Sequence, residues 1–329
     1  MDWTTTQFRE MAAPVVESDA FSRLRQITFL GVLSAYYKEL RGFPITYRST
    51  APRRSDRTRA HHSFSVAWLT GRLSAKLQLS KPAVDYAVMW GLLHDIATWP
   101  LSHTGEAAFA RSTETDPREL RAMMILGSDR LSKSLSLHPL IKAASLDHST
   151  LIALFDKRTT GSDQDLAVVH KLVHSVLTPD TIEGMHRSGS VFDVAVPHPK
   201  LFLGALERDL VSGVRVRHNS SSLIFNFWRG KSKIYSNFIN TTRAIEFEST
   251  WSRAIQDSFA KTSLRDSLEL SEREIIRRVV DTALAKPKAD QRYKEPLLYL
   301  IADGYKRRRS FNHSVPLEGL SMVFVKKKR

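Results

Sequence analysis

Two stretches of sequence decide the fold: HHSFSVAWLTGRL at 61–73 and YAVMWGLLHDIA at 86–97. Both have the composition of buried helix, yet the second contains the adjacent pair His94-Asp95. A charged carboxylate in a run of Val, Met, Trp and Leu costs several kcal/mol to bury unless it is paired or bound to a metal. The pattern therefore predicts helices that carry a polar site into the core.

The polar residues of this site form a set suited to a metal. His62 upstream and Asp180 downstream add to His94 and Asp95, which makes two imidazoles and two carboxylates. These donors suit Mn, Fe, Co, Ni, Zn or Mg. We therefore expect one divalent metal ion as the cofactor, with its identity open. The alternative is a structural His-Asp pair inside a core.

Composition is that of an ordinary globular protein. The 329 residues are 42% hydrophobic and 25% charged, enough for one large or two modest domains. Apolar runs fall short of the roughly 18 residues that cross a bilayer, and the N-terminus lacks a signal-peptide core. We expect a cytoplasmic protein with no membrane partner. The absence of cysteine excludes disulfides, thiolate ligands and cysteine nucleophiles.

The chain is strongly basic. Lys and Arg number 49 against 34 Asp and Glu, a net charge of +15. This excess favours polyanionic partners, either a nucleotide substrate or DNA or RNA. Basic clusters lie at 52–59, 305–309 and 326–329, and solvated surface is the alternative for each. The first cluster runs directly into the candidate metal site. A homo-oligomer is left open.

Hydrophobic periodicity predicts a mainly α protein with a small β hairpin in its C-terminal part. The hairpin is expected at 213–228, with its turn at Asn219–Ser222. Helices are expected at 62–79, 82–97, 118–135, 139–157, 163–177, 231–261, 271–285 and 297–309, and a short strand at 321–326.

Three parts are expected along the chain. Residues 1–54 form an N-terminal helical segment, and residues 55–190 form the metal-binding catalytic core. Residues 191–329 form a C-terminal helical extension that packs on the core and contains the small β element.

The motifs resemble those of the HD-domain phosphohydrolase superfamily, in which a His, a His-Asp pair and a distant Asp converge on a metal. The closest likeness is to the deoxynucleoside triphosphate triphosphohydrolases. Their R-x-x-H-S pattern is matched by RAHHS at 59–63, and their H-D-x-G-H-x-P-F-S/G-H-x-x-E pattern is matched in part by HDIATWPLSHTGE at 94–106. Their D-x-x-D-Y-x-x-R segment is matched in part by DTIEGMHR at 180–187. The resemblance implies an HD-domain helical bundle.

The resemblance also implies residue roles. His62, His94, Asp95 and Asp180 would bind the metal, and His103 with Glu106 would transfer protons. The H-x-x-E spacing places these last two side chains on one helix face. Arg59 and Arg187 would bind phosphate oxygens bidentately, with structural ion pairs as the alternative for each. His148 is a further catalytic candidate, with a core or surface histidine as its alternative.

The departures from the family patterns concern the substrate. Ala97 and Thr98 replace a Gly-His pair, so one phosphate-contacting imidazole is missing. Trp99 replaces a small residue, and its indole is expected to narrow the pocket. Gly184 stands where a substrate-contacting tyrosine is usual.

The function implied is that of a metal-dependent phosphohydrolase. Its substrate would be a nucleotide, most directly a deoxynucleoside triphosphate, attacked at a phosphoryl group by a metal-activated water. Two alternatives are an HD-type nuclease or phosphodiesterase acting on nucleic acid, favoured by the positive charge, and a non-catalytic nucleic-acid-binding or regulatory protein.

Overall fold

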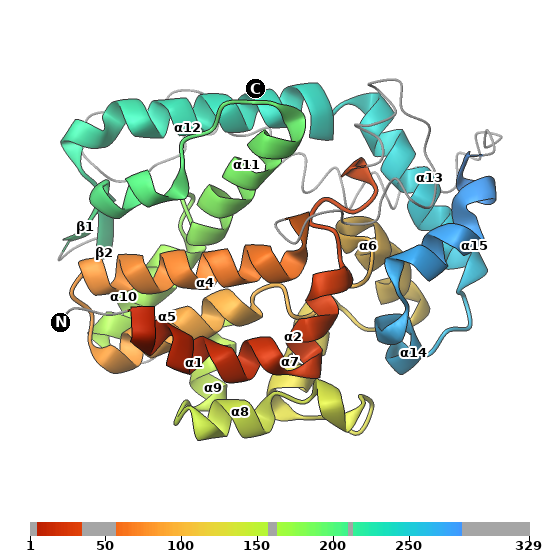
Figure 1. Cartoon of the computed structure of the whole chain (residues 1–329), viewed down its shortest axis with the longest axis horizontal. Coiled ribbons are helices and arrows are strands. Elements are labelled where there is room, and N and C mark those ends of the chain that lie inside the picture. Colours follow the sequence, from red (N-terminus) through yellow and green to blue (C-terminus); the bar gives the residue numbers. More distant parts are fainter. Residues whose placement is uncertain (1–4, 35–56, 157–162, 210–212, 285–329) are drawn as a thin grey trace.

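The computed structural model describes residues 5–34, 57–156, 163–209 and 213–284. Within these ranges the chain is mainly helical with one two-stranded antiparallel sheet, which confirms the predicted fold class (Figure 1). The longer helices are α1 Thr5–Glu17, α4 Arg59–Lys76, α5 Lys81–Leu93, α6 Ser102–Ser112, α7 Pro117–Leu126, α10 Gln164–His174, α11 Pro179–Phe192, α12 Ser221–Ile234, α13 Thr242–Ser258 and α15 Glu272–Leu284. The shorter elements are α2 Asp19–Ser22, α8 His138–Ala143, α9 His148–Phe155, α14 Leu264–Glu269, β1 Leu206–Asp209 and β2 Gly213–Val216.

Helices α4 and α5 form the centre of the molecule and pack along each other (Figure 1). α5 is apolar on nearly every side, as expected of a helix surrounded by others. α1 and α11 contact this pair as well. The two central helices approach so closely that a Cβ on Gly91 would lie 2.4 Å from the Cα of Ala67. Only glycine permits this backbone contact.

Helix ends place the polar residues. α4 begins after Thr58, whose side chain caps the helix by accepting from the backbone N–H of His61. α5 ends at Leu93, earlier than the predicted end at residue 97. His94 therefore caps the helix and Asp95 lies in the following turn, where its carbonyl accepts from the N–H of Thr98 at 2.9 Å. Ending the helix here frees the two adjacent side chains to face one point.

The hairpin lies earlier in the chain than predicted. Its strands are β1 and β2, paired in the register Leu206 with Val216. The predicted second strand instead belongs to α12, which buries Ile224, Phe227 and Trp228 along one face. This segment is rich in Phe, Trp and Ile, so its pattern fits both the helical period of about 3.6 residues and the strand period of 2. Packing against α11 selects the helix.

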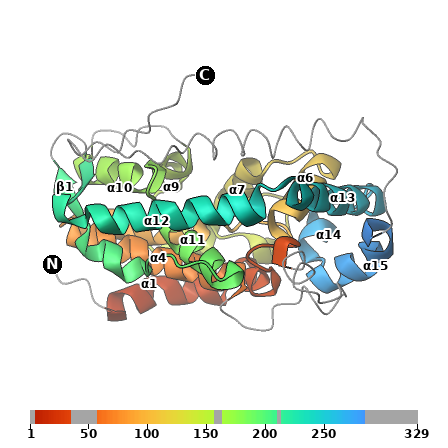
Figure 2. The same cartoon turned by 90° about the horizontal axis from the view of Figure 1, so that it is seen from above.

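Helices α13, α14 and α15 lie together at one end of an elongated molecule (Figures 1 and 2). α13 packs on α6 and on α15, so these C-terminal helices border the segment that follows the His-Asp pair. The division into three parts stays a prediction. The predicted helix at 297–309, the strand at 321–326 and most of the basic residues in the three clusters lie outside the described residues. In the part of the chain that the structure describes, every helix is too short or too polar to span a membrane.

We predict that Gly91→Ala destabilises the fold although alanine is the better helix former. The added Cβ must push α4 and α5 apart, and overpacking of this kind costs about 1–3 kcal/mol. Chemical denaturation of the variant measures this loss. Gly204→Ala is the control, because a Cβ there has nothing within 4 Å. A Gly91→Ala variant as stable as Gly204→Ala would contradict the prediction.

Candidate metal centre

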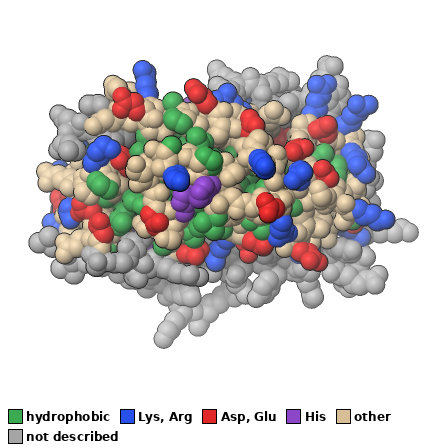
Figure 3. All heavy atoms as spheres, turned by 90° about the horizontal axis from the view of Figure 1, so that it is seen from below, with side chains coloured by type: hydrophobic (Ala, Val, Ile, Leu, Met, Phe, Trp, Pro, Cys, Tyr) green, Lys and Arg blue, Asp and Glu red, His purple; other side chains and the backbone are tan. Residues whose placement is uncertain are grey.

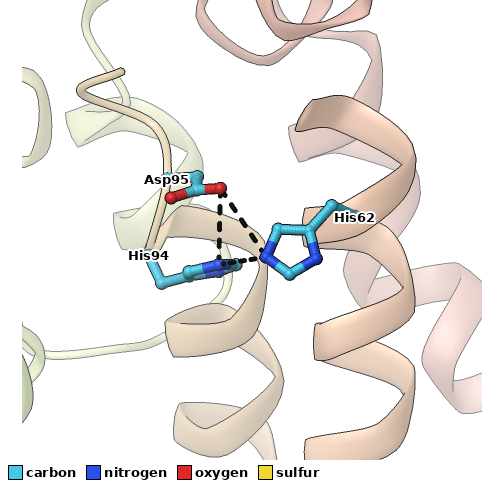
Figure 4. Close-up of side chains that lie close together, drawn as sticks. All are labelled: His62, His94 and Asp95. Carbon is cyan, nitrogen blue, oxygen red and sulfur yellow. Dashed lines mark hydrogen bonds and ion pairs between the residues drawn. The ribbon is translucent and has the colours of Figure 1, made fainter. Parts of the chain in front are cut away.

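Four side chains from three parts of the chain meet at one point. His62 comes from α4, His94 and Asp95 from the end of α5, and Asp180 from the first turn of α11. The Nε2 atoms of His62 and His94 lie 3.1 Å apart, and Asp95 Oδ2 lies 3.7 Å and 3.6 Å from them (Figure 4). Asp180 Oδ1 lies 3.1 Å from His62 Nε2 and 3.6 Å from His94 Nε2. The structure thus brings together all four predicted metal ligands.

The spacing of these atoms fits a metal ion. Ligands about 2.1 Å from one ion are separated from each other by about 3.0–3.4 Å in tetrahedral or octahedral geometry. Among the described residues, His62, His94 and Asp95 form a group whose ligand atoms all lie within 4.8 Å of one another. The donor set and its spacing therefore match a divalent cation site.

Hydrogen bonds orient both imidazoles through their Nδ1 atoms. His94 Nδ1 donates to the carbonyl of Gly91 at 2.8 Å, and His62 Nδ1 donates to Glu183 Oε2. Both rings therefore turn Nε2 towards the other ring, and two unprotonated nitrogens 3.1 Å apart repel each other unless a proton or a metal ion lies between them. This geometry is the clearest sign that the site holds a positive charge.

The surrounding carboxylates also favour a positive charge at this position. Burial opposes protonation of His62, but Glu183, Asp180 and Asp95 together raise its pKa to about 9. Burial also lowers the pKa of His94. Burial alone would raise the pKa of Asp95, yet Arg59 and the two histidines hold it well below its usual range. The same histidines lower the pKa of Asp180 to about 2 against its burial.

Exposure of the ligands shows where the site opens. The side chains of His62 and His94 are 1% and 8% exposed, and that of Asp95 is 15% exposed. Asp180 is 47% exposed. The cluster is therefore accessible to solvent from the side of Asp180 and the start of α11.

Both predicted phosphate-binding arginines border the cluster, and both form ion pairs there. Arg59 is buried and donates from Nη1 to Asp95 Oδ2 at 2.8 Å. Arg187 donates from Nε to Glu183 Oε2 at 3.2 Å and from Nη2 to Oε1 of the same carboxylate. The structural alternative for each is thus present, and phosphate binding stays a prediction.

Sequence reasoning missed two residues beside the cluster. Glu183 links His62 to Arg187, and its place three residues after Asp180 and four before Arg187 was an available signal, because such residues share a helix face. Phe29 packs on His62 with ring centroids 4.6 Å apart, and the guanidinium of Arg59 lies 4.9 Å from its ring. The sequence carried no signal for Phe29, which lies far from every motif.

Phe29 also lies next to Gly184, the position of the missing tyrosine. A Cβ at residue 184 would lie 3.4 Å from the Cζ of Phe29 and 3.6 Å from His62 Cε1. The aromatic ring beside the metal ligands thus comes from the N-terminal part of the chain.

Arg121 is a third residue that sequence reasoning missed, and like Phe29 it has no sequence signal. Its Nη2 donates to the backbone carbonyl of His94 at 2.6 Å, and its guanidinium lies 4.6 Å from the ring of Phe155. Trp90 stacks between Phe155 and His94. A hollow of about 220 Å³ lies between α7 and α9, with Arg118, Arg121 and Phe155 in its walls. Arg121 therefore joins this hollow to the metal ligand His94.

His103 and Glu106 lie on one face of α6, as their spacing predicted. His103 Nδ1 is 3.6 Å from Glu106 Oε2, and the two side chains are 64% and 31% exposed. Their role in proton transfer stays a prediction.

His148 is not brought to the cluster. Its ring stacks on His138 at a centroid distance of 4.2 Å, and its Nε2 donates to the His138 carbonyl at 3.2 Å. Figure 3 views the molecule from the side of α8 and α9 and shows histidine side chains at a surface of mixed charge. The structure thus places His148 in the surface setting given as its alternative, and its catalytic role stays a prediction.

Trp99 does not narrow an open pocket. The indole is fully buried, and its Nε1 donates to Ser267 Oγ in α14 at 3.1 Å. Thr98 is also buried, and its carbonyl accepts from Arg23 Nη1 at 2.6 Å. The expected effect on the pocket was wrong because these residues belong to the core under the C-terminal helices.

Residues 59–172 match the model of the HD domain. The chain therefore contains an HD domain, and HD-domain proteins are in general metal-dependent hydrolases. The match includes His62, His94 and Asp95 and ends before Asp180.

One solved structure shows that the likeness extends beyond the matched residues. It is the crystal structure of a hypothetical protein from Aquifex aeolicus, similar with a TM-score of 0.64 and 15% sequence identity. The alignment covers 93% of this chain and 79% of that chain. At this identity the likeness shows a shared fold alone. A search of curated proteins finds no match to this chain.

We predict that Glu183→Gln weakens metal binding about 10- to 100-fold, the range for residues that orient a ligand histidine. Glutamine retains an acceptor for His62 Nδ1 but removes the negative charge that strengthens the imidazole as a ligand. Calorimetric titration with Mn²⁺ measures the affinity, and circular dichroism checks that the variant is folded. An unchanged affinity in the folded variant would show that Glu183 stabilises α11 through Arg187 and does not support the metal site.

Proposed function

We propose that the chain is a metal-dependent phosphohydrolase that acts on nucleotides, most directly on deoxynucleoside triphosphates. The observation that carries the proposal is the pair of histidine Nε2 atoms held 3.1 Å apart beside two carboxylates. The HD domain at residues 59–172 supports a hydrolase, and the resemblance of the motifs around residues 59, 94 and 180 supports the nucleotide branch.

His62, His94, Asp95 and Asp180 would hold the metal. When bound, a divalent ion supplies Lewis-acid chemistry, because it activates water as a nucleophile and polarises a phosphoryl oxygen. His62 and His94 present their Nε2 atoms for this task because Glu183 and Gly91 occupy their Nδ1 protons. The cluster would be reached from the side of Asp180, whose side chain is the most exposed of the four.

The arginines would stabilise the negative charge of the phosphate chain. A guanidinium has five N–H donors in a planar fork. The bonds of Arg59 to Asp95 and Ser102 use two of them, so donors remain for a phosphate oxygen. The ion pairs with Asp95 and Glu183 then hold both guanidiniums in place before the substrate arrives. Such preorganised charge is what stabilises phosphoryl transfer.

The positive charge of the whole chain suits the same substrate. A net charge of +15 accelerates encounter with polyanions and makes the association rate fall with added salt. The same charge would also favour DNA or RNA as a substrate. Product analysis separates these two possibilities.

We predict that the protein releases a phosphorus product from a deoxynucleoside triphosphate in the presence of Mg²⁺, Mn²⁺, Co²⁺ or Ni²⁺. Chromatography of the products from a panel of nucleotides and nucleic acids tests this. Asp95→Asn is the matched control, because asparagine retains an acceptor for Arg59 but loses a charged metal ligand, and it should abolish turnover. Tripolyphosphate would identify the triphosphohydrolase reaction, and orthophosphate or pyrophosphate a different cleavage point. Rapid cutting of DNA or RNA without cleavage of any nucleotide would replace the proposal with the nuclease alternative.

We predict that His103→Ala lowers kcat by roughly 10²–10⁴-fold with little change in metal content, as expected for a general acid or base. His148→Ala should leave kcat unchanged, because its ring stacks on His138 at the surface. Steady-state kinetics and metal analysis of both variants provide the comparison. Equal activity of the two variants would move the proton-transfer role to another residue.

A further inference from the structure

A buried carboxylate from the C-terminal helices lies between two turns that border the metal centre. Glu272, the first residue of α15, is 3% exposed. Its Oε1 accepts from the N–H of Thr28 at 2.9 Å and from the N–H of Leu101 at 2.8 Å. The hydroxyl of Thr28 lies 2.9 Å from each of its oxygens. One side chain thus bonds two segments that are distant in sequence.

Both turns have backbone conformations that need support. Leu101 and Ser102 have φ of +66° and +56°, the left-handed region that side chains other than glycine disfavour. In the other turn Gly31 has φ of +53°, and a Cβ on it would lie 2.1 Å from the carbonyl oxygen of Leu101. Conformations of this kind persist where the surrounding structure holds them. Glu272 supplies bonds to both turns at their point of contact.

The first turn leads to a metal ligand. Thr28 precedes Phe29, whose ring packs on His62 and lies 4.9 Å from the guanidinium of Arg59. A shift of Thr28 would therefore move the aromatic ring that backs the imidazole.

The second turn leads to another metal ligand. Ser102 Oγ accepts from Arg59 Nε at 3.0 Å and donates to the Thr28 carbonyl at 2.5 Å. Arg59 in turn donates to Asp95 Oδ2 at 2.8 Å. Ser102 also begins α6, so its position sets that of His103 and Glu106 as well.

Packing of α15 alone does not require a carboxylate at this place. The same helix buries Ile275, Ile276 and Val279, which dock it by apolar contact. Burial raises the pKa of Glu272 to about 7, which shows that a charge at this place is unfavourable. The buried carboxylate of Glu272 is therefore better explained by its bonds to the two turns than by the docking of α15.

We propose that Glu272 is a positioning residue of the metal centre: by bonding the Thr28 and Leu101 turns together, it fixes Phe29 against His62 and Ser102 against Arg59. The effect that we expect of Glu272 on turnover rests on the proposed function. The effect that we expect on metal affinity does not. The C-terminal helices, which lie outside the matched HD domain, thereby hold part of its site in place.

Three variants of the full chain test this inference. Glu272→Ala removes both acceptors and leaves two backbone N–H groups unpaired. Glu272→Gln keeps an acceptor oxygen for those groups and removes the charge. Val279→Ala removes buried apolar volume two turns further along the same helix, so it weakens docking without touching either turn. Calorimetric titration with Mn²⁺ is performed below the melting temperature of every variant, and kcat is measured on the nucleotide that the wild type cleaves.

We expect Glu272→Ala to weaken Mn²⁺ binding about tenfold and to lower kcat to a similar extent, the lower end of the range for residues that support metal ligands. Glu272→Gln should restore most of the affinity, and Val279→Ala should lower the melting temperature with wild-type affinity. Wild-type affinity in folded Glu272→Ala, or equal losses in Glu272→Ala and Val279→Ala, would overturn the inference. If the wild type binds Mn²⁺ but cleaves no nucleotide, the proposed function fails, and the calorimetric comparison still decides the role of Glu272.

Discussion

The site depends on the close approach of α4 and α5. The two helices are joined by a short connection and meet backbone to backbone at Ala67 and Gly91, nearer than side chains on both faces would allow. His62 precedes Ala67 by five residues, and His94 follows Gly91 by three. Because the helices run in opposite directions, these two steps, at about 1.5 Å per residue, lead towards the same end of the pair. The close helix contact at Gly91 therefore helps to bring the two Nε2 atoms to within 3.1 Å of each other.

That distance in turn determines the electrostatics around it. Two imidazole nitrogens this close require a proton or a metal ion between them, and the carboxylates of Asp95, Asp180 and Glu183 surround this position. Two guanidiniums balance part of this negative charge from the outside, one on Asp95 and one on Glu183. Breaking a buried pair of this kind by removing one partner leaves an uncompensated charge in the core. The arginines therefore have a structural task whether or not they also bind phosphate.

Sequence alone predicted the mainly helical fold and the four residues that converge, because both leave local signals. A His-Asp pair in an apolar run is conspicuous, and helical periodicity extends over many residues. The later assignments failed where the signal was short or absent. The aromatic segment around Phe227 fits either period, and only packing on α11 selects a helix. Glu183 is visible as a helix neighbour of Asp180, whereas Phe29 and Arg121 reach the site through tertiary contacts that no spacing along the chain records.

Trp99 shows how a departure from a motif can be misread when the rest of the fold is unknown. A bulky residue directly after a metal-binding pair suggests a narrower pocket, since the motif is read as a list of groups that face the substrate. In the structure the indole donates a hydrogen bond to Ser267 in α14, and Thr104, five residues on, donates one to Glu248 in α13. With Glu272 on Leu101, these contacts attach the segment from Trp99 to the first turn of α6 to the C-terminal helices. Thr98 and Trp99, which differ from the motif, thus lie where this chain packs segments from outside its HD domain. The segment before α6 is therefore part of the core as well as part of the site.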